Sequence, residues 1–182
     1  MGKKSLMGRH RRAGFTLIEL LVTVGIAAVL LMLALPSFTA ALRSNRVSSA
    51  TNLTLASLNL ARAEALRSKT SGRVCPAPAS SSSKTCGTDW SKGLLVWTDE
   101  NNDKKQQESE TKRIVETPRE IQIAMDPGAT SEIVFDDRGR TLNRTTYKVI
   151  VKPSVCNSSE ETRRSISVSG VGRVQVTREK CV

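Results

Sequence analysis

The chain has 182 residues, a length that suits one domain together with one extended helix. It carries 28 lysines and arginines against 17 acidic residues, a formal net charge of +11, and its only histidine is His10. With one histidine near the N-terminus and no nucleotide-binding loop, the sequence shows no catalytic constellation, so we expect no enzyme activity and no cofactor.

The first 14 residues form a basic block without an acidic residue. Its five cations are Lys3, Lys4, Arg9, Arg11 and Arg12. Such a block stays on the cytoplasmic side of a membrane by the positive-inside rule. Between Glu19 and Arg43 lie 23 uncharged residues, 20–42. As a helix they would extend about 34 Å, enough to cross a hydrocarbon core of about 30 Å, so they predict a membrane span.

Glu19 is the one charge at the head of this apolar segment. A carboxylate at the bilayer centre costs about 2.5–3.5 kcal/mol on insertion scales, and less near the interface. Two interpretations are open: Glu19 lies at headgroup level, or it meets a cation inside an assembly. We favour the second, the usual role of an intramembrane charge. A secretory signal fits less well because no good cleavage site follows the apolar core.

The segment Gly14-Phe15-Thr16-Leu17-Ile18-Glu19-Leu20 resembles the leader junction of type IV pilins and type II secretion pseudopilins. The resemblance implies that a prepilin peptidase cleaves after Gly14 and methylates the new N-terminal Phe15. It also implies that Glu19 is the assembly carboxylate, which pairs with the N-terminal amine of a neighbouring subunit. Pro36 stands where pilin helices often carry a proline, which commonly kinks a helix without ending it.

The same resemblance implies a division of the chain and a location. Residues 1–14 are the leader, 15–42 the transmembrane and filament-core half of the helix, and 43–182 the exposed periplasmic domain. Without the leader, 23 basic and 17 acidic residues leave a net charge of +6. The protein is expected in the inner membrane as a single-pass chain with a periplasmic C-terminal domain, and afterwards in the pilus. Its expected partners are major and minor pilins, the prepilin peptidase and the inner-membrane assembly platform.

The helix is expected to continue past Pro36, because residues 43–69 are rich in Ala, Leu, Arg and Ser and contain neither Gly nor Pro. We therefore expect a single helix over residues 15–70. Spacings of three and four residues predict an apolar face that packs on a sheet, made of Leu58, Ala61, Ala65 and Leu66. Gly72 follows at a position typical of a helix C-cap.

The rest of the chain predicts short β-strands. A Pro/Ser loop between Cys75 and Cys86 precedes a buried strand at 93–98. Further strands are expected at 112–116, 120–125, 131–136, 146–152, 165–169 and 173–177. Turn residues separate them, so we expect an α+β fold like that of type IV pilins, with the long helix packed on a mostly antiparallel sheet.

An acidic run follows the strand at 93–98 and resembles a calcium-binding loop in part. Asp and Asn alternate from Asp99, and Glu110 occupies the twelfth position. Such a loop needs glycine at its sixth position, where this chain has Lys104, so we expect a solvated loop. Other metal sites need close pairs of cysteines together with histidines, which the sequence lacks, and no metal is expected.

The four cysteines, Cys75, Cys86, Cys156 and Cys181, allow three pairings. In an oxidising periplasm we expect Cys75–Cys86 and Cys156–Cys181. Each disulfide would stabilise the fold by about 3 kcal/mol on the chain-entropy model. The second would tie down the C-terminal strand.

Scattered motifs extend the resemblance over most of the chain. Segments 59–65, 135–139 and 172–174 are similar to those of the minor pilin group that includes FimT, FimU and the secretion pseudopilin GspH. Some members resembling FimT bind DNA through a C-terminal Gly-Arg-x-Arg, whereas this chain has Gln175 in place of the second arginine. Arg173 and Arg178 are the candidate DNA contacts. We favour a solvated basic face, because few aromatic residues are present to stack on bases.

Together these patterns predict a minor type IV pilin that primes or caps pilus assembly and so serves pilus biogenesis and twitching motility. Two alternatives stay open: a DNA-binding minor pilin for natural transformation, and a minor pseudopilin of type II secretion. The residue patterns hardly separate the pilus from the secretion system.

Overall fold

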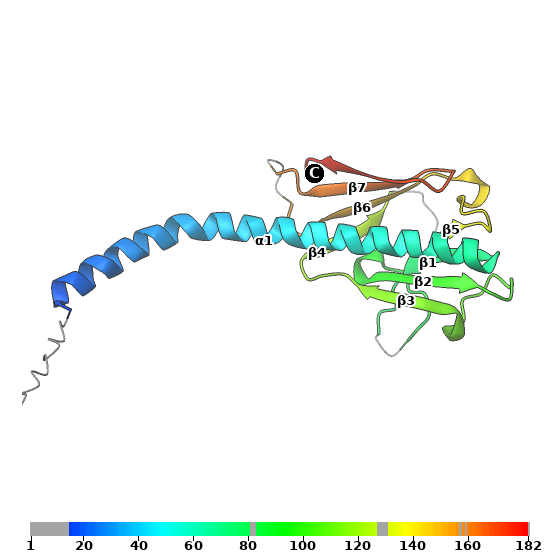
Figure 1. Cartoon of the computed structure of the whole chain (residues 1–182), viewed down its shortest axis with the longest axis horizontal. Helices are drawn as coiled ribbons and strands as arrows, with labels where there is room; N and C mark the ends of the chain where they lie inside the picture. The colour runs from blue at the N-terminus through cyan, green and yellow to red at the C-terminus, as the bar shows by residue number, and fades with distance from the viewer. Residues whose placement is uncertain (1–14, 81–82, 127–130, 157, 159, 182) are drawn as a thin grey trace, which may run out of the picture. The chain divides into compact units, whose positions relative to one another are not determined.

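Figure 1 presents a computed structural model of the chain. The structure describes residues 15–80, 83–126, 131–156, 158 and 160–181. The chain divides into two compact units, Met1–Ala41 and Leu42–Val182. A single helix, α1 (Leu17–Ser68), belongs to both units. Its 52 residues confirm the expected long helix.

Helix α1 ends without the glycine cap that the sequence predicted. Lys69 takes φ +58, the left-handed conformation that stops a helix. Gly72 lies instead in strand β1 (Ser71–Pro76), so its assignment as the cap was wrong. A Cβ at Gly72 would collide with the carbonyl oxygen of Ala61. Glycine is therefore needed where β1 crosses closely over the helix.

Small and hydroxyl-bearing residues form much of the face of α1 that packs on the sheets. Leu58, Ala61 and Ala65 are fully buried as expected, whereas Leu66 is 40% exposed and lies off this face. The buried face continues toward the N-terminus through Val47, Ala50, Thr51, Thr54 and Ser57. The three hydroxyls donate to the carbonyl four residues earlier at 2.7 to 2.9 Å, so they are satisfied within the helix.

The strands form two antiparallel sheets, where the sequence predicted one. The first has the order β3-β2-β1-β5 and the second β4-β6-β7-β8. Strand β1 was not predicted, although it lies centrally between β2 and β5. The other strands are β2 (Gly93–Asp99), β3 (Thr111–Glu116), β4 (Ile121–Met125), β5 (Ile133–Phe135), β6 (Tyr147–Pro153), β7 (Arg163–Val168) and β8 (Val174–Glu179). Short 3-10 helices connect some of them: η1 (Trp90–Lys92), η2 (Glu108–Glu110) and η3 (Leu142–Arg144).

Both sheets pack on the C-terminal part of α1 around one core, and Figure 1 shows that part of the helix running beside β1–β3 and β6–β7. The first sheet contributes Val74, Leu94, Val96, Ile133 and Phe135. The second sheet contributes Ile121, Ile123, Tyr147, Val149, Val151, Ile166 and Val168. Because the side chains of a strand alternate between faces, the opposite faces of the sheets are left for other contacts.

On the outer face of the first sheet, a second apolar cluster contains Cys75, Leu95 and Trp97, all fully buried. Cys86 packs against this cluster and forms a disulfide with Cys75, with a Cα–Cα distance of 5.8 Å. The other expected disulfide, Cys156–Cys181, is also present, with a Cα–Cα distance of 5.4 Å. Both predicted pairings are confirmed.

The acidic run after β2 uses its carboxylates within the protein. Asp99 is 1% exposed and lies 3.5 Å from the guanidinium of Arg73. Glu110 is also buried and accepts from the backbone N–H of Glu100 at 2.9 Å and of Gln107 at 3.2 Å. Residues 100–105 are exposed, as expected for a solvated loop, whereas Asp99 and Glu110 at its two ends are buried. Over the described part of the chain, no group of three or more His, Cys, Asp or Glu side chains is placed to hold a metal ion.

Candidate assembly site

The sequence at the start of α1 builds its own helix cap. The backbone N–H of Glu19 donates to the hydroxyl of Thr16 at 3.2 Å, and Leu20 N–H donates to the Thr16 carbonyl at 3.2 Å. Thr16 is thus the N-cap and Glu19 the third helical residue, the spacing of a capping box. Phe15, just before the cap, is 85% exposed. Gly14, the predicted cleavage position, lies outside the described residues.

The Glu19 carboxylate is exposed and near the positive end of the helix dipole. This position favours a negative charge by about 0.3–1 kcal/mol in water. Among the residues that the structure describes, no side chain pairs with this carboxylate. The spacing of Glu19 from Phe15 places it one helical turn from the predicted N-terminal residue.

The N-terminal half of α1 exposes apolar side chains on every side. Their exposed fractions run from 40% at Leu42 to 85% at Phe15. The set is Phe15, Leu17, Ile18, Leu20, Leu21, Val22, Val24, Ile26, Val29, Leu30, Leu31, Met32, Leu35, Phe38 and Leu42. A monomer in water does not keep so continuous an apolar surface, so this half of the helix requires a covering partner or solvent.

The predicted membrane span at residues 20–42 is not recovered in the structure. Within the described ranges, no helix is both long enough and apolar enough to cross a membrane. Pro36 lies within the bounds of α1, and the kink expected there stays a prediction.

Three segments that were grouped only by family resemblance meet at one place in the Leu42–Val182 unit. Arg62, on α1, donates from Nε to the carbonyl of Gly139 at 2.8 Å. Gly172, in the turn between β7 and β8, lies so close that a Cβ there would collide with the same carbonyl. Both glycines have left-handed backbones, φ +70 and φ +75, which other residues adopt at a cost. The resemblance motifs therefore mark a packing junction.

Asp136 organises the turn that carries Gly139. Its carboxylate accepts from the backbone N–H of Arg138 and Arg140 at 3.0 and 2.8 Å, and from the Arg140 guanidinium at 2.8 and 2.9 Å. Burial acts to raise the pKa of Asp136, but the hydrogen bonds from Arg140 and Arg138 outweigh it and hold the pKa below its usual value. The turn is thus fixed by charge as well as by glycine.

The two candidate DNA contacts do not share a surface. Arg173 is exposed in the turn before β8, where its backbone N–H donates to the Ser169 hydroxyl at 3.2 Å. Arg178 lies in β8 and lines a pocket with residues of α1. On an extended strand, positions 173 and 178 point to opposite faces. The structure therefore does not bring them together as one phosphate-binding surface.

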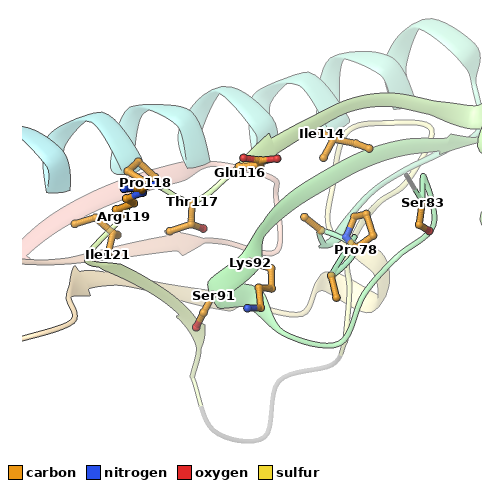
Figure 2. Close-up of a pocket in the computed structure, with 12 residues that line it drawn as sticks. Pro78, Ser83, Ser91, Lys92, Ile114, Glu116, Thr117, Pro118, Arg119 and Ile121 are labelled. Atoms are coloured by element: carbon orange, nitrogen blue, oxygen red, sulfur yellow. The ribbon is translucent and has the colours of Figure 1, made fainter. Parts of the chain in front are cut away.

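A groove lies beside edge strand β3. Figure 2 shows its walls, which come from the loop after β1, η1, β3 and the connection to β4. The groove has a volume of about 690 Å³ and includes Lys92, Glu116 and Arg119. Its polar side chains are mixed in charge, and the lining contains neither histidine nor cysteine.

The sequence analysis did not identify two side chains that shape these sites, Thr16 and Arg62. Thr16 had a local signal, since a threonine three residues before a glutamate at the start of an apolar run is typical of a helix start. Arg62 had none, because its acceptor lies 77 residues away along the chain. Only the folded structure identifies it.

Comparison with known proteins supports this description. The family model described as Type II transport protein GspH matches residues 50–172, and the prokaryotic N-terminal methylation motif matches residues 9–35. A search of curated protein sequences returned no match.

Two crystal structures of the type IV minor pilin FimU from Pseudomonas aeruginosa (strain PAO1) share the fold at 18% sequence identity. One superposes with a TM-score of 0.55 over 75% of this chain and 95% of FimU, the other with 0.54 over 74% and 97%. This likeness confirms the expected pilin-like α+β fold. Because the GspH model also matches more than half of the sequence, the chain belongs to the GspH family.

Proposed function

We propose that this protein is a minor type IV pilin, a structural subunit that enters a filament through the N-terminal half of α1. The observation that carries the proposal is an exposed apolar half-helix with a carboxylate at its head that no side chain of the described residues pairs with. The prepilin peptidase would cleave after Gly14 and methylate Phe15. Glu19 would then accept the N-terminal amine of a neighbouring subunit.

The burial of apolar side chains and the burial of the Glu19 charge contribute different free energies to assembly. Burying one large apolar side chain stabilises by about 1.5–3 kcal/mol, and the exposed set at the N-terminal half of α1 has many members. Burying Glu19 without a partner opposes this by about 2.5–3.5 kcal/mol. Before assembly, lipid already covers these side chains, so apolar burial keeps this half of the helix out of water in both states, and packing between helices favours the filament. The pairing of Glu19 fixes the register, because any shifted position leaves its charge unpaired.

Before assembly, we place the protein in the inner membrane with residues 43–182 in the periplasm. The basic residues 1–14 favour the cytoplasmic side for the leader. The two disulfides support an oxidising compartment for the rest of the chain. Major and minor pilins, the prepilin peptidase and the assembly platform are the proposed partners.

The test replaces Glu19 with alanine in the full chain and measures the protein in sheared pili. We expect incorporation to fall about ten- to a hundredfold, the equivalent of a charge-assisted pair of 1.5–3 kcal/mol. Glu108→Ala is the control, because Glu108 is an exposed carboxylate in the Leu42–Val182 unit. Normal incorporation of Glu19→Ala would refute the pairing. Intact mass of the processed protein should show methylated Phe15 as the first residue.

A second candidate is a minor pseudopilin of type II secretion, favoured by the description of the matching family model. Deleting the gene separates the two. Loss of surface pili with normal protein secretion supports the pilin, and the opposite pattern supports the pseudopilin.

A further inference from the structure

Two arginines face each other across the last two strands of the second sheet. Arg164 of β7 and Arg178 of β8 are directly opposed in the antiparallel register. Directly opposed residues project from the same face, with Cβ atoms about 4.5–5.5 Å apart. The next pairs in the register on that face are Ile166 with Val176 and Val168 with Val174. Ile166 and Val168 are fully buried in the core, so the arginine pair faces α1.

The buried member of the pair lacks an acidic partner. Arg164 is 7% exposed and donates from Nη1 to the backbone carbonyls of Glu161 at 2.7 Å and Arg163 at 3.1 Å. Within the described residues, neither Arg164 nor Arg178 forms an ion pair with a carboxylate. Like charges directly opposed on a sheet destabilise it. Two opposed arginines without a compensating negative charge thus destabilise the fold.

The electrostatics agree with this geometry. Burial lowers the pKa of Arg164, the charge of Arg178 lowers it further, and Glu161 opposes both without reversing them. The charge of Glu161 therefore does not compensate the pair. A second negative charge close to both guanidiniums would.

A pocket of about 310 Å³ lies where that charge would bind. Its walls are Arg164, Val176 and Arg178 on the sheet and Ser48, Thr51, Asn52 and Leu55 on α1. Ser48 lies three and four residues before Thr51 and Asn52, and Leu55 lies four and three residues after them, so the four form one stripe on α1. Ser48 and Asn52 are exposed, and both carry polar hydrogens. The Thr51 hydroxyl is already committed to the Val47 carbonyl.

We propose that the arginine pair, together with Ser48 and Asn52, binds one small oxyanion, a phosphate or a carboxylate, in this pocket. Guanidiniums present a planar fork of donors that matches either group. The hydroxyl of Ser48 and the amide of Asn52 add neutral donors from the opposite wall. Leu55 and Val176 close the apolar side of the pocket.

The test measures thermal unfolding of the full chain in a non-ionic detergent as phosphate replaces chloride at constant ionic strength. Arg178→Gln removes one guanidinium from an exposed edge-strand position, and Arg173→Gln is the control, since Arg173 is exposed and outside the pocket. Phosphate stabilises proteins generally, so the comparison is between variants at equal phosphate. We expect the apparent phosphate affinity to fall at least about tenfold in Arg178→Gln and to stay unchanged in Arg173→Gln. Equal phosphate responses in both variants would overturn the proposal.

The variant Arg178→Glu provides an independent test of the proposal. It places a carboxylate opposite Arg164, so in chloride alone it should melt at a higher temperature than Arg178→Gln. Its response to phosphate should not exceed the general stabilisation that Arg178→Gln also shows. A lower melting temperature than Arg178→Gln would contradict the proposed cost of the uncompensated pair. Acetate in place of phosphate identifies the source of the oxyanion. Stabilisation by both anions supports a carboxylate such as a neighbouring polypeptide presents, and stabilisation by phosphate alone supports phosphate.

Discussion

Replacing Arg62 with methionine tests the junction at which α1, the Asp136 turn and the β7–β8 turn meet. Arg62 donates from Nε to the Gly139 carbonyl at 2.8 Å. The same Nε lies 3.0 Å from where a Cβ at Gly139 or Gly172 would stand. Methionine keeps an unbranched stem of similar length beneath the two glycines, so packing is largely retained while the hydrogen bond is lost.

The expected cost follows from the kind of hydrogen bond. A bond from a charged donor contributes about 1.5–3 kcal/mol, and its loss leaves the half-buried carbonyl of Gly139 without this donor. A domain of this size loses about 2–4 °C of melting temperature per kcal/mol, which gives a decrease of roughly 3–12 °C.

The assays are thermal unfolding, which gives the melting temperature, and urea unfolding, which gives the free energy of unfolding, of the disulfide-intact Leu42–Val182 unit, both followed by circular dichroism. Arg67→Met is the matched control, because Arg67 lies on the same helix in an exposed ion pair with Glu64 and such pairs contribute at most about 1 kcal/mol. The m-values should agree, which would show that the same surface unfolds in each variant. Equal loss of stability in the two variants would refute the argument for the junction.

Three further changes test other parts of the fold. Gly72→Ala should destabilise the Leu42–Val182 unit by about 3 kcal/mol in the same assay. The new Cβ would collide with the carbonyl oxygen and carbon of Ala61, which are backbone atoms. Asp136→Asn should lower stability at pH 7 and lose this effect below about pH 4. The folded pKa of Asp136 is depressed, so its contribution is present above the unfolded value of about 3.9 and disappears as pH falls through the folded value. Joint replacement of Cys156 and Cys181 by alanine should lower the free energy of unfolding by about 3.5 kcal/mol, from a loop with a sequence separation of 25.

The parts of the fold that sequence predicts well are those with local causes. Helix α1 was predicted because an apolar run is followed by residues 43–69, which favour helix and contain neither Gly nor Pro. The strands other than β1 were predicted from β-branched runs between turn residues. The head of α1 was found in the same way, since Phe15 and Glu19 lie four residues apart in a continuous motif.

Strand β1 was missed because its signal is tertiary. It contains Gly72 and ends at Pro76, and a Pro/Ser loop follows it, so the local pattern indicates a loop. Glycine is there because Ala61 of the helix lies against the strand. No pattern within a single segment carries that requirement, and the same holds for the contact between Arg62 and Gly139.

The N-terminal part of the buried face of α1 was missed for a different reason, and only its C-terminal part was predicted. Apolar periodicity identified Leu58, Ala61 and Ala65, which are fully buried. Thr51 and Thr54 are also buried, but an analysis of hydrophobic spacing counts them as polar. Their hydroxyls bond to carbonyls of the previous turn, so the outward surface is a methyl group. Polar residue type and polar surface are thus different quantities on this helix.

The two halves of α1 obey different requirements, and mutations should separate them. The half in the Met1–Ala41 unit exposes its apolar side chains and contains Glu19, so changes there act on a contact with another molecule. The half in the Leu42–Val182 unit is buried along one face and contains Arg62, so changes there act on folding. Glu19→Ala should accordingly reduce assembly at unchanged stability of the globular unit, and Arg62→Met should reduce stability first. If Glu19→Ala instead destabilised the globular unit, the carboxylate would have a partner within its own chain, and the assembly argument would lose its basis.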